Sequence, residues 1–517
     1  MLVLLLATRV FAYDFAWGFG GSAYQTEGAW NVGGKEPGVF DTWYHTNFPN
    51  AANADVTTDQ YHRYKDDLKL LPTFGATLYR FSVSWPRVMK GCSGEVNPEG
   101  IAFYSDMIDE IIKNGAVPFL TMYHWDLPQA CFEQYRGWAS DQIIPDFVKY
   151  ADALFTAFGD GRVNYWLTIN EAESGCKFGF QQGRLAPGLK NDTYQATIDC
   201  VKRNHLIHGA VVNLARSKYD ATRKGWKFGF PSNVEWNEGP DAVSAEKRNL
   251  AYAAWYHDPL VFGDFQQDTI SAFIDNKENL DAAGRAPPSF TDTEKASMKG
   301  TVDFIAMNYY STAGIPVSQE DVPSGAGCPA YCWQHVWGQG ARKMANWYYK
   351  RYNMDIIVTE LGYAGVNEAD MTLDQVVNDP NRLKFWQSHA TALAQALEED
   401  QVPVKGMLMW SLLDNFEWGY YDQKFGAVHV VGLGTSGGTL ERVVKNSTRW
   451  LADYYRQKKY KNPFAVGKLP SFDENVSTSK PGAANTGVAT VTKIQSVSTT
   501  KFSSIVPLLC MMLFFIL

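Results

Sequence analysis

Residues 355–362 read DIIVTELG, an apolar run that ends in glutamate, leucine and glycine. Residues 164–171, NYWLTINE, repeat the pattern, with Glu171 near the end of its run as Glu360 is in the first. Runs that are almost continuously apolar are typical of strands covered on both faces, as in a parallel sheet. A charge next to such a strand is costly unless it is paired. The two segments therefore predict a parallel sheet with two acidic side chains at its edge.

Six further segments have the same character, which gives eight strand candidates in all. These eight alternate with amphipathic stretches. They are FAWGFGGSAYQ (15–25), ATLYRFSVSW (76–85), VPFLTMYH (117–124), NYWLTINE (164–171), WKFGFPSN (226–233), FIAMNYY (304–310), DIIVTELG (355–362) and GMLMWSLLD (406–414). Between them, residues 99–115 predict a helix with Tyr104, Ile108 and Ile111 on one face and Gly115 beyond its end.

Eight strands that alternate with helices favour a single (β/α)8 TIM barrel of the α/β class, with enlarged βα loops, over residues 13–466. A doubly wound open sheet is the alternative, and the sequence shows no Gly-rich nucleotide loop that would favour it. Residues 434–438, GTSGG, match the pattern of a serine nucleophile elbow. Because no strand is predicted before them and no helix after them, we interpret this match as accidental.

Composition narrows the classes of function. The 517 residues include 47 Lys and Arg against 55 Asp and Glu, a net charge of -8, which argues against a nucleic-acid partner. The 17 Trp and 27 Tyr suggest a site that stacks on flat ligand faces. Neither a Cys/His metal cluster nor a phosphate-binding loop is recognisable, so no metal or other cofactor is expected.

The two ends of the chain predict its compartment. Residues 1–12, MLVLLLATRVFA, resemble a signal peptide, although a buried first strand is the alternative because a charged start is missing. Residues 467–504 form a Ser/Thr-rich linker, and the hydrophobic tail 505–517 is shorter than the roughly 20 residues that span a bilayer. This pattern resembles a glycosylphosphatidylinositol signal with its modification site near Asn485 or Ser496; a tail-anchored helix is the alternative.

We therefore expect a secreted or cell-surface protein that meets a membrane only through this anchor, with its oligomeric state left open. Of seven cysteines, Cys510 lies in the tail. The others are compatible with three disulfides of open pairing, in which Cys328 and Cys332 could close one loop: Cys92, Cys131, Cys176, Cys200, Cys328 and Cys332. Sequons at Asn191, Asn446 and Asn475 would accept glycans in a secreted chain.

Polar side chains near the carboxyl ends of the strands face the active site of such a barrel. Besides the two glutamates they are Gln25, Arg80, His124, Asn170, Asn308, Tyr310, Trp410, Glu417 and Trp418. Amide, hydroxyl and indole groups of this kind suit a sugar ring. Each glutamate alone could be an ion-pair partner, but two that converge suggest a general acid and a nucleophile acting on one bond.

Seven segments in order carry a more specific signal: SAYQTEG, YRFSVSWPRV, YHWDLPQ, TINEA, MNYY, VTELG and WSLLDNFEWGY. In these the chain resembles β-glucosidases of glycoside hydrolase family 1. The resemblance implies that Glu171 is the acid/base and Glu360 the nucleophile of a retaining double displacement. In retaining enzymes the two carboxyl groups lie about 5 to 5.5 Å apart.

The resemblance also implies the roles of the other side chains. Arg80 would be the cation beside Glu360, and the hydroxyl of Tyr310 would steady the same carboxylate. The remaining residues would bind the substrate: Gln25, Glu417 and Trp418 the far hydroxyls, His124 the 3-hydroxyl, Asn170 the 2-hydroxyl, Asn308 the same sugar, Trp410 the ring face and Trp333 the aglycone.

The chain departs from the family pattern at two neighbours of the glutamates. Ala172 stands where the family usually has proline, and Leu361 where it usually has asparagine, which puts rate or loop geometry in question. Retention of Glu171 disfavours thioglycosides, and the intact NFEW segment disfavours 6-phosphosugars.

The predicted function is retaining hydrolysis of terminal β-D-glucosides, with galactosides and fucosides not distinguished, on a small β-glycoside or oligosaccharide. A transglycosylase on the same scaffold and a catalytically silent, klotho-like binding protein are the alternatives.

Overall fold

The structure is a computed structural model and describes residues 13–48, 52–191, 193–239, 241–275, 287–314, 334, 336–365 and 368–464. Several sequence predictions fall on residues that are not described. These are the signal peptide 1–12, the linker 467–504, the tail 505–517, Trp333, Cys328, Cys332 and Asn475.

Within the described ranges, nine parallel strands form one curled sheet in the order β5-β4-β3-β2-β1-β9-β8-β7-β6. The strands are β1 (Ala16–Gly20), β2 (Leu78–Ser82), β3 (Val117–Tyr123), β4 (Tyr165–Ile169), β5 (Lys227–Gly229), β6 (Ser232–Asn237), β7 (Ile305–Ala313), β8 (Ile356–Leu361) and β9 (Val404–Met409). Only Phe230 and Pro231 separate β5, which pairs with β4, from β6, which pairs with β7. The ring therefore closes through the chain itself, and the predicted barrel is confirmed.

The prediction of one strand over 226–233 is wrong, because this strand breaks into β5 and β6. Pro231 has no N–H to give to a neighbouring strand. The prediction over 15–25 is also too long, since β1 ends at Gly20 and Gln25 lies on helix α1 (Ala23–Thr26). There the backbone N–H of Ala23 donates to the hydroxyl of Ser82 at 2.7 Å, which turns the chain away from the sheet.

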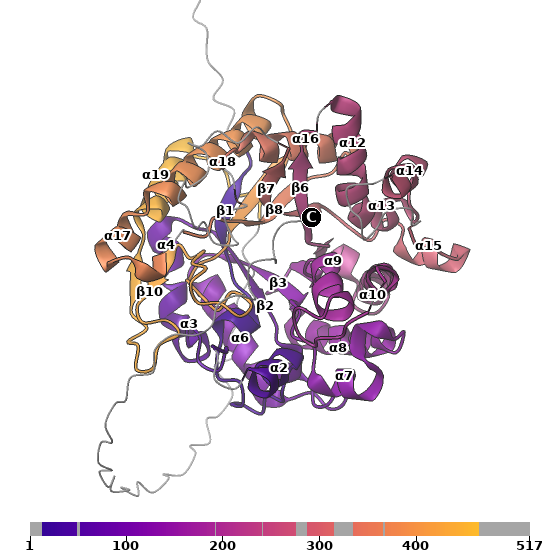
Figure 1. Ribbon diagram of the computed structural model, residues 1–517, viewed down its shortest axis with the longest axis horizontal. Helices are drawn as coiled ribbons and strands as arrows, with labels where there is room; N and C mark the ends of the chain where they lie inside the picture. Colours follow the sequence, from indigo (N-terminus) through magenta and orange to yellow (C-terminus); the bar gives the residue numbers. More distant parts are fainter. Residues whose placement is uncertain are drawn as a thin grey trace, which may run out of the picture.

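Helices surround the sheet (Figure 1). The longer ones are α2 (Val39–Asn47), α3 (Gln60–Leu68), α6 (Pro98–Lys113), α7 (Gln129–Tyr135), α8 (Ile143–Phe158), α10 (Gln195–Lys218), α12 (Ala242–Asn249), α13 (Trp255–Phe262), α14 (Gln267–Asp275), α15 (Asp292–Met298), α16 (Gln339–Tyr352), α17 (Leu373–Asn378), α18 (Pro380–Glu398) and α19 (Asn446–Lys458). Short turns are α4 (Leu70–Phe74), α5 (Trp85–Val88), α9 (Ala172–Gly175), α11 (Ala221–Lys224), the 3₁₀ segments η1 (Gly137–Ala139) and η4 (Glu368–Asp370), and the π segments η2 (Cys176–Gln181) and η3 (Leu250–Ala254).

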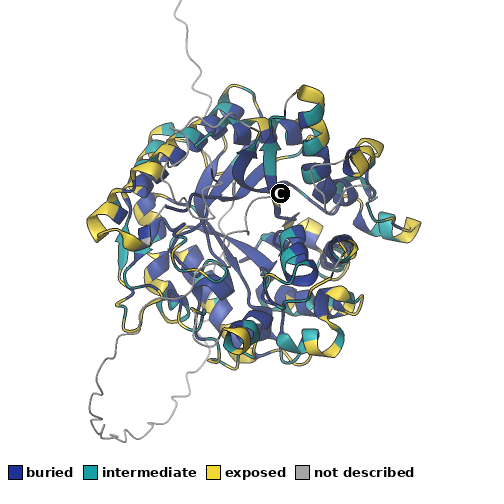
Figure 2. Ribbon diagram, in the orientation of Figure 1, coloured by how far each residue is buried: buried dark blue, intermediate teal, exposed yellow. Residues whose placement is uncertain are grey.

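The core lies between the sheet and this ring of helices. Figure 2 shows buried strands at the centre and exposed residues on the outer faces of the helices. Helix α6 follows the sequence prediction: Tyr104, Ile108 and Ile111 are fully buried, and Gly115 follows the helix end with a left-handed φ of 79°. Glycine adopts this conformation without the steric cost that other residues carry.

Two smaller predictions can also be compared with the structure. Residues 434–438 lie in a turn between two antiparallel strands, β10 (Val428–Val430) and β11 (Arg442–Val444), and so do not form a nucleophile elbow. Of the cysteines that are described, Cys92 bonds to Cys131 and Cys176 bonds to Cys200. No helix within the described part of the chain has the length and apolar character needed to cross a bilayer.

Candidate active site

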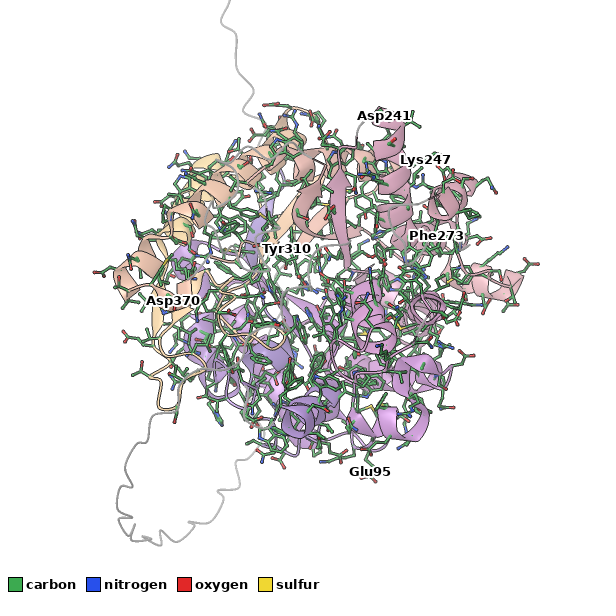
Figure 3. All side chains as sticks on the ribbon, viewed as in Figure 1. Glu95, Asp241, Lys247, Phe273, Tyr310 and Asp370 are labelled. Atoms are coloured by element: carbon green, nitrogen blue, oxygen red, sulfur yellow. A yellow bond between two sulfur atoms is a disulfide. The ribbon has the colours of Figure 1, made fainter. Side chains whose placement is uncertain are left out.

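Both sequence-predicted glutamates lie at the carboxyl end of the barrel. Glu360 is in β8, and Glu171 directly follows Asn170 beyond the end of β4. Tyr310, in β7, is near the centre of the ring in Figure 3. His124 follows β3 and Trp410 follows β9, so strands distant in sequence bring their polar ends to one place.

The carboxylate of Glu360 is only 3% exposed and is held from two sides. Nη1 of Arg80, on β2, donates to its Oε1 at 2.5 Å. The hydroxyl of Tyr310 donates to its Oε2 at 2.7 Å. The positive charge of Arg80 therefore balances the negative charge of Glu360, and both carboxylate oxygens have a fixed direction.

Arg80 also orients the neighbouring side chains. Its Nε donates to Oγ1 of Thr121 at 2.9 Å, and its Nη2 donates to Oδ1 of Asn170 at 2.6 Å. Nη1 reaches the backbone carbonyl of Thr359 at 3.1 Å as well. A buried guanidinium with partners on each nitrogen is stabilised in one orientation.

Glu171 has a different environment. Nδ2 of Asn308 donates to its Oε1 at 2.9 Å, and its backbone N–H donates to the carbonyl of Pro231 at 2.9 Å. Burial, followed by the negative charge of Glu360, raises the pKa of Glu171 to about 8, against the hydrogen bond from Asn308 and the charge of Arg80. At neutral pH this carboxyl group therefore carries a proton.

The amide of Asn308 is itself held in place. The hydroxyl of Thr359 donates to Oδ1 of Asn308 at 2.7 Å, which leaves the Nδ2 group to donate. That group donates to Oδ1 of Asn170 at 3.0 Å as well as to Glu171. Asn308, on β7, therefore binds both residues that follow β4, Asn170 and Glu171.

His124 completes this row of polar groups. Burial and the charge of Arg80 hold the pKa of His124 well below its usual value, so the ring is neutral. Oδ1 of Asn170 accepts from Arg80 and Asn308, so its Nδ2 is the atom that donates to Nε2 of His124, at 3.2 Å. The ring proton of His124 then lies on Nδ1, which has no hydrogen-bond partner among the described residues.

Gln25 and Glu417 form a second polar pair. The hydroxyl of Ser22 donates to Oε1 of Gln25 at 2.6 Å, and Nε2 of Gln25 donates to Oε2 of Glu417 at 2.8 Å and to Oδ1 of Asn415 at 3.3 Å. Burial, followed by the charge of Glu360, raises the pKa of Glu417 to about 8. The charge of Glu360 thus raises the pKa of both Glu171 and Glu417. Hydrogen bonds through Arg80, Asn170 and Asn308 connect Glu360 to Glu171.

Aromatic rings surround these groups. The ring of His124 is stacked 5.5 Å from that of Trp410 and 5.9 Å from that of Trp418. Trp125 packs 4.5 Å from Trp418. A carbon added at Gly20 would lie 3.1 Å from Cε3 of Trp410, so this glycine leaves room for the indole.

Comparison with known proteins shows the family of this chain. A model of glycosyl hydrolase family 1 matches residues 7–460. The chain belongs to glycosyl hydrolase family 1. It is 36% identical to beta-glucosidase 1B of Phanerodontia chrysosporium over 86% of this chain and 85% of that protein.

Solved structures of family 1 are similar as well. A rice β-glucosidase has a TM-score of 0.75 and 31% identity over 85% of this chain and 97% of its own. A β-glucosidase of the fungus Humicola insolens, solved with glucose, has a TM-score of 0.75 and 30% identity over 86% of this chain and 98% of its own.

A pocket lies next to the segment after β4 that carries Glu171. Its walls are mostly apolar and aromatic, and they include Glu171 and Asn170. They are Phe40, Tyr123, Trp125, Trp138, Ile169, Asn170, Glu171, Ala172, Gly175, Cys176, Phe180, Leu185, Ala186 and Asn204. Ala172, which departs from the family pattern, is thus part of the wall.

Sequence reasoning missed the residues that orient the side chains of this candidate site. Thr121, Thr359, Ser22 and Asn415 each fix an arginine or amide side chain. Thr359 and Asn415 stand inside the VTELG and WSLLDNFEWGY segments, which was the available signal. Ser22 likewise stands inside the SAYQTEG segment. Thr121 acts across neighbouring strands, for which one segment gives no signal.

Proposed function

We propose that this chain hydrolyses terminal β-D-glucosides with retention of anomeric configuration, with Glu360 as nucleophile and Glu171 as acid/base. One observation carries the proposal: the two glutamates occupy opposite electrostatic settings at one site. Arg80 and Tyr310 hold the Glu360 carboxylate, while burial and the nearby charge of Glu360 keep a proton on Glu171. A nucleophile and a general acid need these two settings.

In the first step, an oxygen of Glu360 forms a bond to the anomeric carbon as the bond to the glycosidic oxygen breaks. The proton of Glu171 goes to that leaving oxygen. Once Glu360 is esterified its negative charge is gone, and that charge is one cause of the raised pKa of Glu171. The pKa of Glu171 then falls, which suits it to act as a base.

In the second step, Glu171 takes a proton from water as the water oxygen bonds to the anomeric carbon. The bond from Glu360 to the sugar breaks, and the enzyme returns to its starting state. Each displacement inverts the anomeric carbon, so the product keeps the configuration of the substrate.

The sugar would be recognised by the polar groups around the two glutamates. Asn170 is held by Arg80 and Asn308, which suits it to bind the 2-hydroxyl. The Nδ1–H of His124, which has no partner in the described part of the chain, is suited to donate to a hydroxyl oxygen. We assign the far hydroxyls to Gln25, Glu417 and Trp418, and the ring face to Trp410.

We infer an apolar leaving group. The leaving group must lie beside the acid that protonates it, and the pocket next to the Glu171 segment has mostly apolar walls. Apolar walls favour an apolar ligand because its burial removes apolar surface from water. Substrates with aryl or long alkyl leaving groups would then have a lower KM than those with a second sugar.

The experiment is a panel of aryl β-glycosides with glucose, galactose or fucose as the sugar, followed by NMR of the first-formed product. We expect turnover of the glucoside with the β-anomer appearing first. First appearance of the α-anomer would contradict the two-step mechanism. Binding without turnover of any sugar would favour the klotho-like alternative, and alkyl glycosides formed with added alcohol would measure transglycosylation.

We further propose secretion, with residues 1–12 removed and residues 505–517 exchanged for a lipid anchor. The disulfides Cys92–Cys131 and Cys176–Cys200 support an oxidising compartment, and exposed Asn191 and Asn446 suit glycans. The mature chain should begin at Tyr13. Treatment of cells with a phosphatidylinositol-specific phospholipase should release it from the membrane. Release only by detergent would favour the tail-anchored helix.

A further inference from the structure

A second buried glutamate lies two residues beyond Glu171, and the chemistry proposed above does not use it. Glu173 is 9% exposed and belongs to the short helix α9. Its Oε1 accepts a hydrogen bond from the hydroxyl of Tyr194, and its Oε2 accepts one from the hydroxyl of Tyr256 at 2.5 Å. Both carboxylate oxygens already have protein donors, so Glu173 is occupied within the protein.

The two tyrosines come from other parts of the ring of helices. Tyr194 directly precedes α10, Tyr256 lies in α13, and both are buried. Burial, followed by the charge of Glu173, raises the pKa of Tyr256 well above its usual value, so its hydroxyl keeps the proton that it donates. Nε2 of His205, on α10, lies 3.2 Å from the carbonyl oxygen of Tyr256. Glu173 therefore ties α9 to two helices that also contact each other.

Helix α9 needs such support because of the residue that precedes it. Glu171 has left-handed backbone angles, φ 43° and ψ 64°, which are unfavourable for a residue with a β-carbon. Such a conformation persists only where the surroundings impose it. The bond from the N–H of Glu171 to Pro231 holds one side of the residue, and the bond from the N–H of Gly175 to the carbonyl of Glu171, 3.1 Å long, joins the other side to α9.

We propose that Glu173, through Tyr194 and Tyr256, is a positioning residue that fixes α9 and with it the conformation from which Glu171 protonates the leaving group. The inference rests on the proposed function, in which Glu171 is the acid/base. Glu173 lies two residues after Glu171 in α9, and the same helix is joined to Glu171 by the bond from the N–H of Gly175.

The test compares two β-glucosides that differ in their need for an acid. A 2,4-dinitrophenyl leaving group departs without a proton, whereas an alkyl alcohol requires one. In Glu173→Gln and in the double variant Tyr194→Phe, Tyr256→Phe, kcat/KM for the alkyl glucoside should fall by about 10- to 100-fold. For the dinitrophenyl glucoside it should stay within about twofold of wild type.

Matched controls remove similar groups elsewhere. Glu110→Gln changes a buried glutamate of α6, and Tyr219→Phe removes a hydroxyl that donates to Oδ1 of Asp152 at 2.6 Å. Both should cleave the two substrates like wild type. Labelling with a 2-fluoroglucoside that carries a dinitrophenyl group needs Glu360 but no acid, so it counts the folded active sites in every variant.

The outcomes separate this inference from the function on which it rests. Equal losses on both substrates would show a purely structural role for Glu173 and overturn the inference, as would no loss on either. If wild type cleaves neither glucoside, the proposed function fails and the inference fails with it. Loss confined to the alkyl glucoside, at an unchanged count of labelled sites, supports the positioning role.

Discussion

At the scale of single residues, the two glutamates differ in the charge of their partners. Glu360 accepts hydrogen bonds from the cation Arg80 and from Tyr310, whereas Glu171 accepts one from the neutral amide of Asn308. Because the environments are so different, exchanging the roles of the two residues is chemically disfavoured. The assignment can be tested one residue at a time.

The nucleophile is tested by Glu360→Gln. The amide cannot form the glycosyl ester, so kcat should fall by about 10⁴-fold or more with little change in fold. Initial rates on an aryl β-glucoside and a thermal melt measure the two effects. The control is Glu398→Gln. Glu398 lies on α18 and pairs with Lys458 on α19, and this variant should remain active. Near-normal activity of Glu360→Gln would exclude Glu360 as the nucleophile.

The acid is tested by pH. Glu171 must carry a proton to donate, and its pKa is raised to about 8, so kcat/KM for an alkyl glucoside should be level at neutral pH and fall as pH rises through about 8. Glu417 also has a pKa raised to about 8 and could add to this limb. Glu171→Ala, assayed with the dinitrophenyl glucoside, removes the contribution of Glu171. An unchanged alkaline limb in that variant would assign the limb to Glu417.

The positions of these residues could be predicted from the sequence, while their orientation could not. Arg80, Asn308 and Glu360 follow or interrupt apolar runs, which places them near strand ends. The hydroxyl of Thr359 orients Asn308 across two strands, and that contact depends on the register between β7 and β8. The register there shifts next to Asn308, and nothing in either strand alone specifies such a shift.

At the scale of elements, the segment from β4 through α9 to η2 carries Glu171, the proposed acid. The disulfide Cys176–Cys200 joins the start of η2 to α10. Nδ2 of Asn204 donates to the carbonyl of Cys200 at 2.8 Å, one turn further along α10. The disulfide therefore holds the segment that follows Glu171 to α10.

Replacing Cys176 and Cys200 by alanine should lower the free energy of unfolding by about 3 kcal/mol, since the disulfide links positions 24 residues apart. It should also lower kcat for alkyl glucosides, because η2 directly follows α9. The pair Cys92 and Cys131, 39 residues apart, is the control, with a similar loss of stability but unchanged kcat. Urea unfolding and steady-state kinetics measure both. Unchanged stability in both pairs would contradict the expectation.

Element types were easier to predict than element ends. The helix over 99–115 was predicted because its apolar residues recur at helical spacing and glycine follows. The end of β1 at Gly20 and the break at Pro231 are set by contacts with other segments, such as the bond from Ala23 to Ser82. Glu173 was missed for the same reason, because its partners are far along the chain.

At the scale of the whole molecule, a buried network of charges joins the loops after β8 and β9 to the last two long helices. Nζ of Lys445 contacts Oε2 of Glu368 and Oδ1 of Asp414, both at 2.9 Å. Nη2 of Arg382, on α18, contacts Oε1 of Glu368 at 2.5 Å, and Nδ1 of His429 lies 2.8 Å from Oδ2 of Asp414. Asp414 directly precedes the loop of Asn415 and Glu417, so the network supports the loop to which we assign sugar binding.

Lys445→Met should lower the free energy of unfolding by about 3 to 5 kcal/mol, because it leaves two buried carboxylates short of a partner. Lys458→Met, which removes a partly exposed ion pair with Glu398, is the control and should cost less than about 1 kcal/mol. Urea unfolding at pH 7 measures the difference. Equal effects of the two substitutions would mean that the buried network adds little.

The same network affects how the free energy of unfolding changes as pH falls. Burial alone would raise the pKa of Asp414, but the charge of Lys445 and the bond with His429 hold it below its usual value. A carboxyl group whose pKa is lowered by folding stabilises the fold fully at pH values above its unfolded pKa of about 4. This stabilisation is lost as pH falls from there toward the lower pKa of the folded state. Wild type should therefore lose stability toward acid more steeply than Lys445→Met.

The two residues between β5 and β6 connect the two ends of the strand order and so close the barrel. One of them, Pro231, accepts the hydrogen bond from the N–H of Glu171. The same residue thus helps to close the barrel and to hold the backbone of the proposed proton donor. A chain in which Pro231 is displaced has no fixed donor. During refolding, turnover of alkyl glucosides should therefore not return before the segment between β5 and β6 has formed.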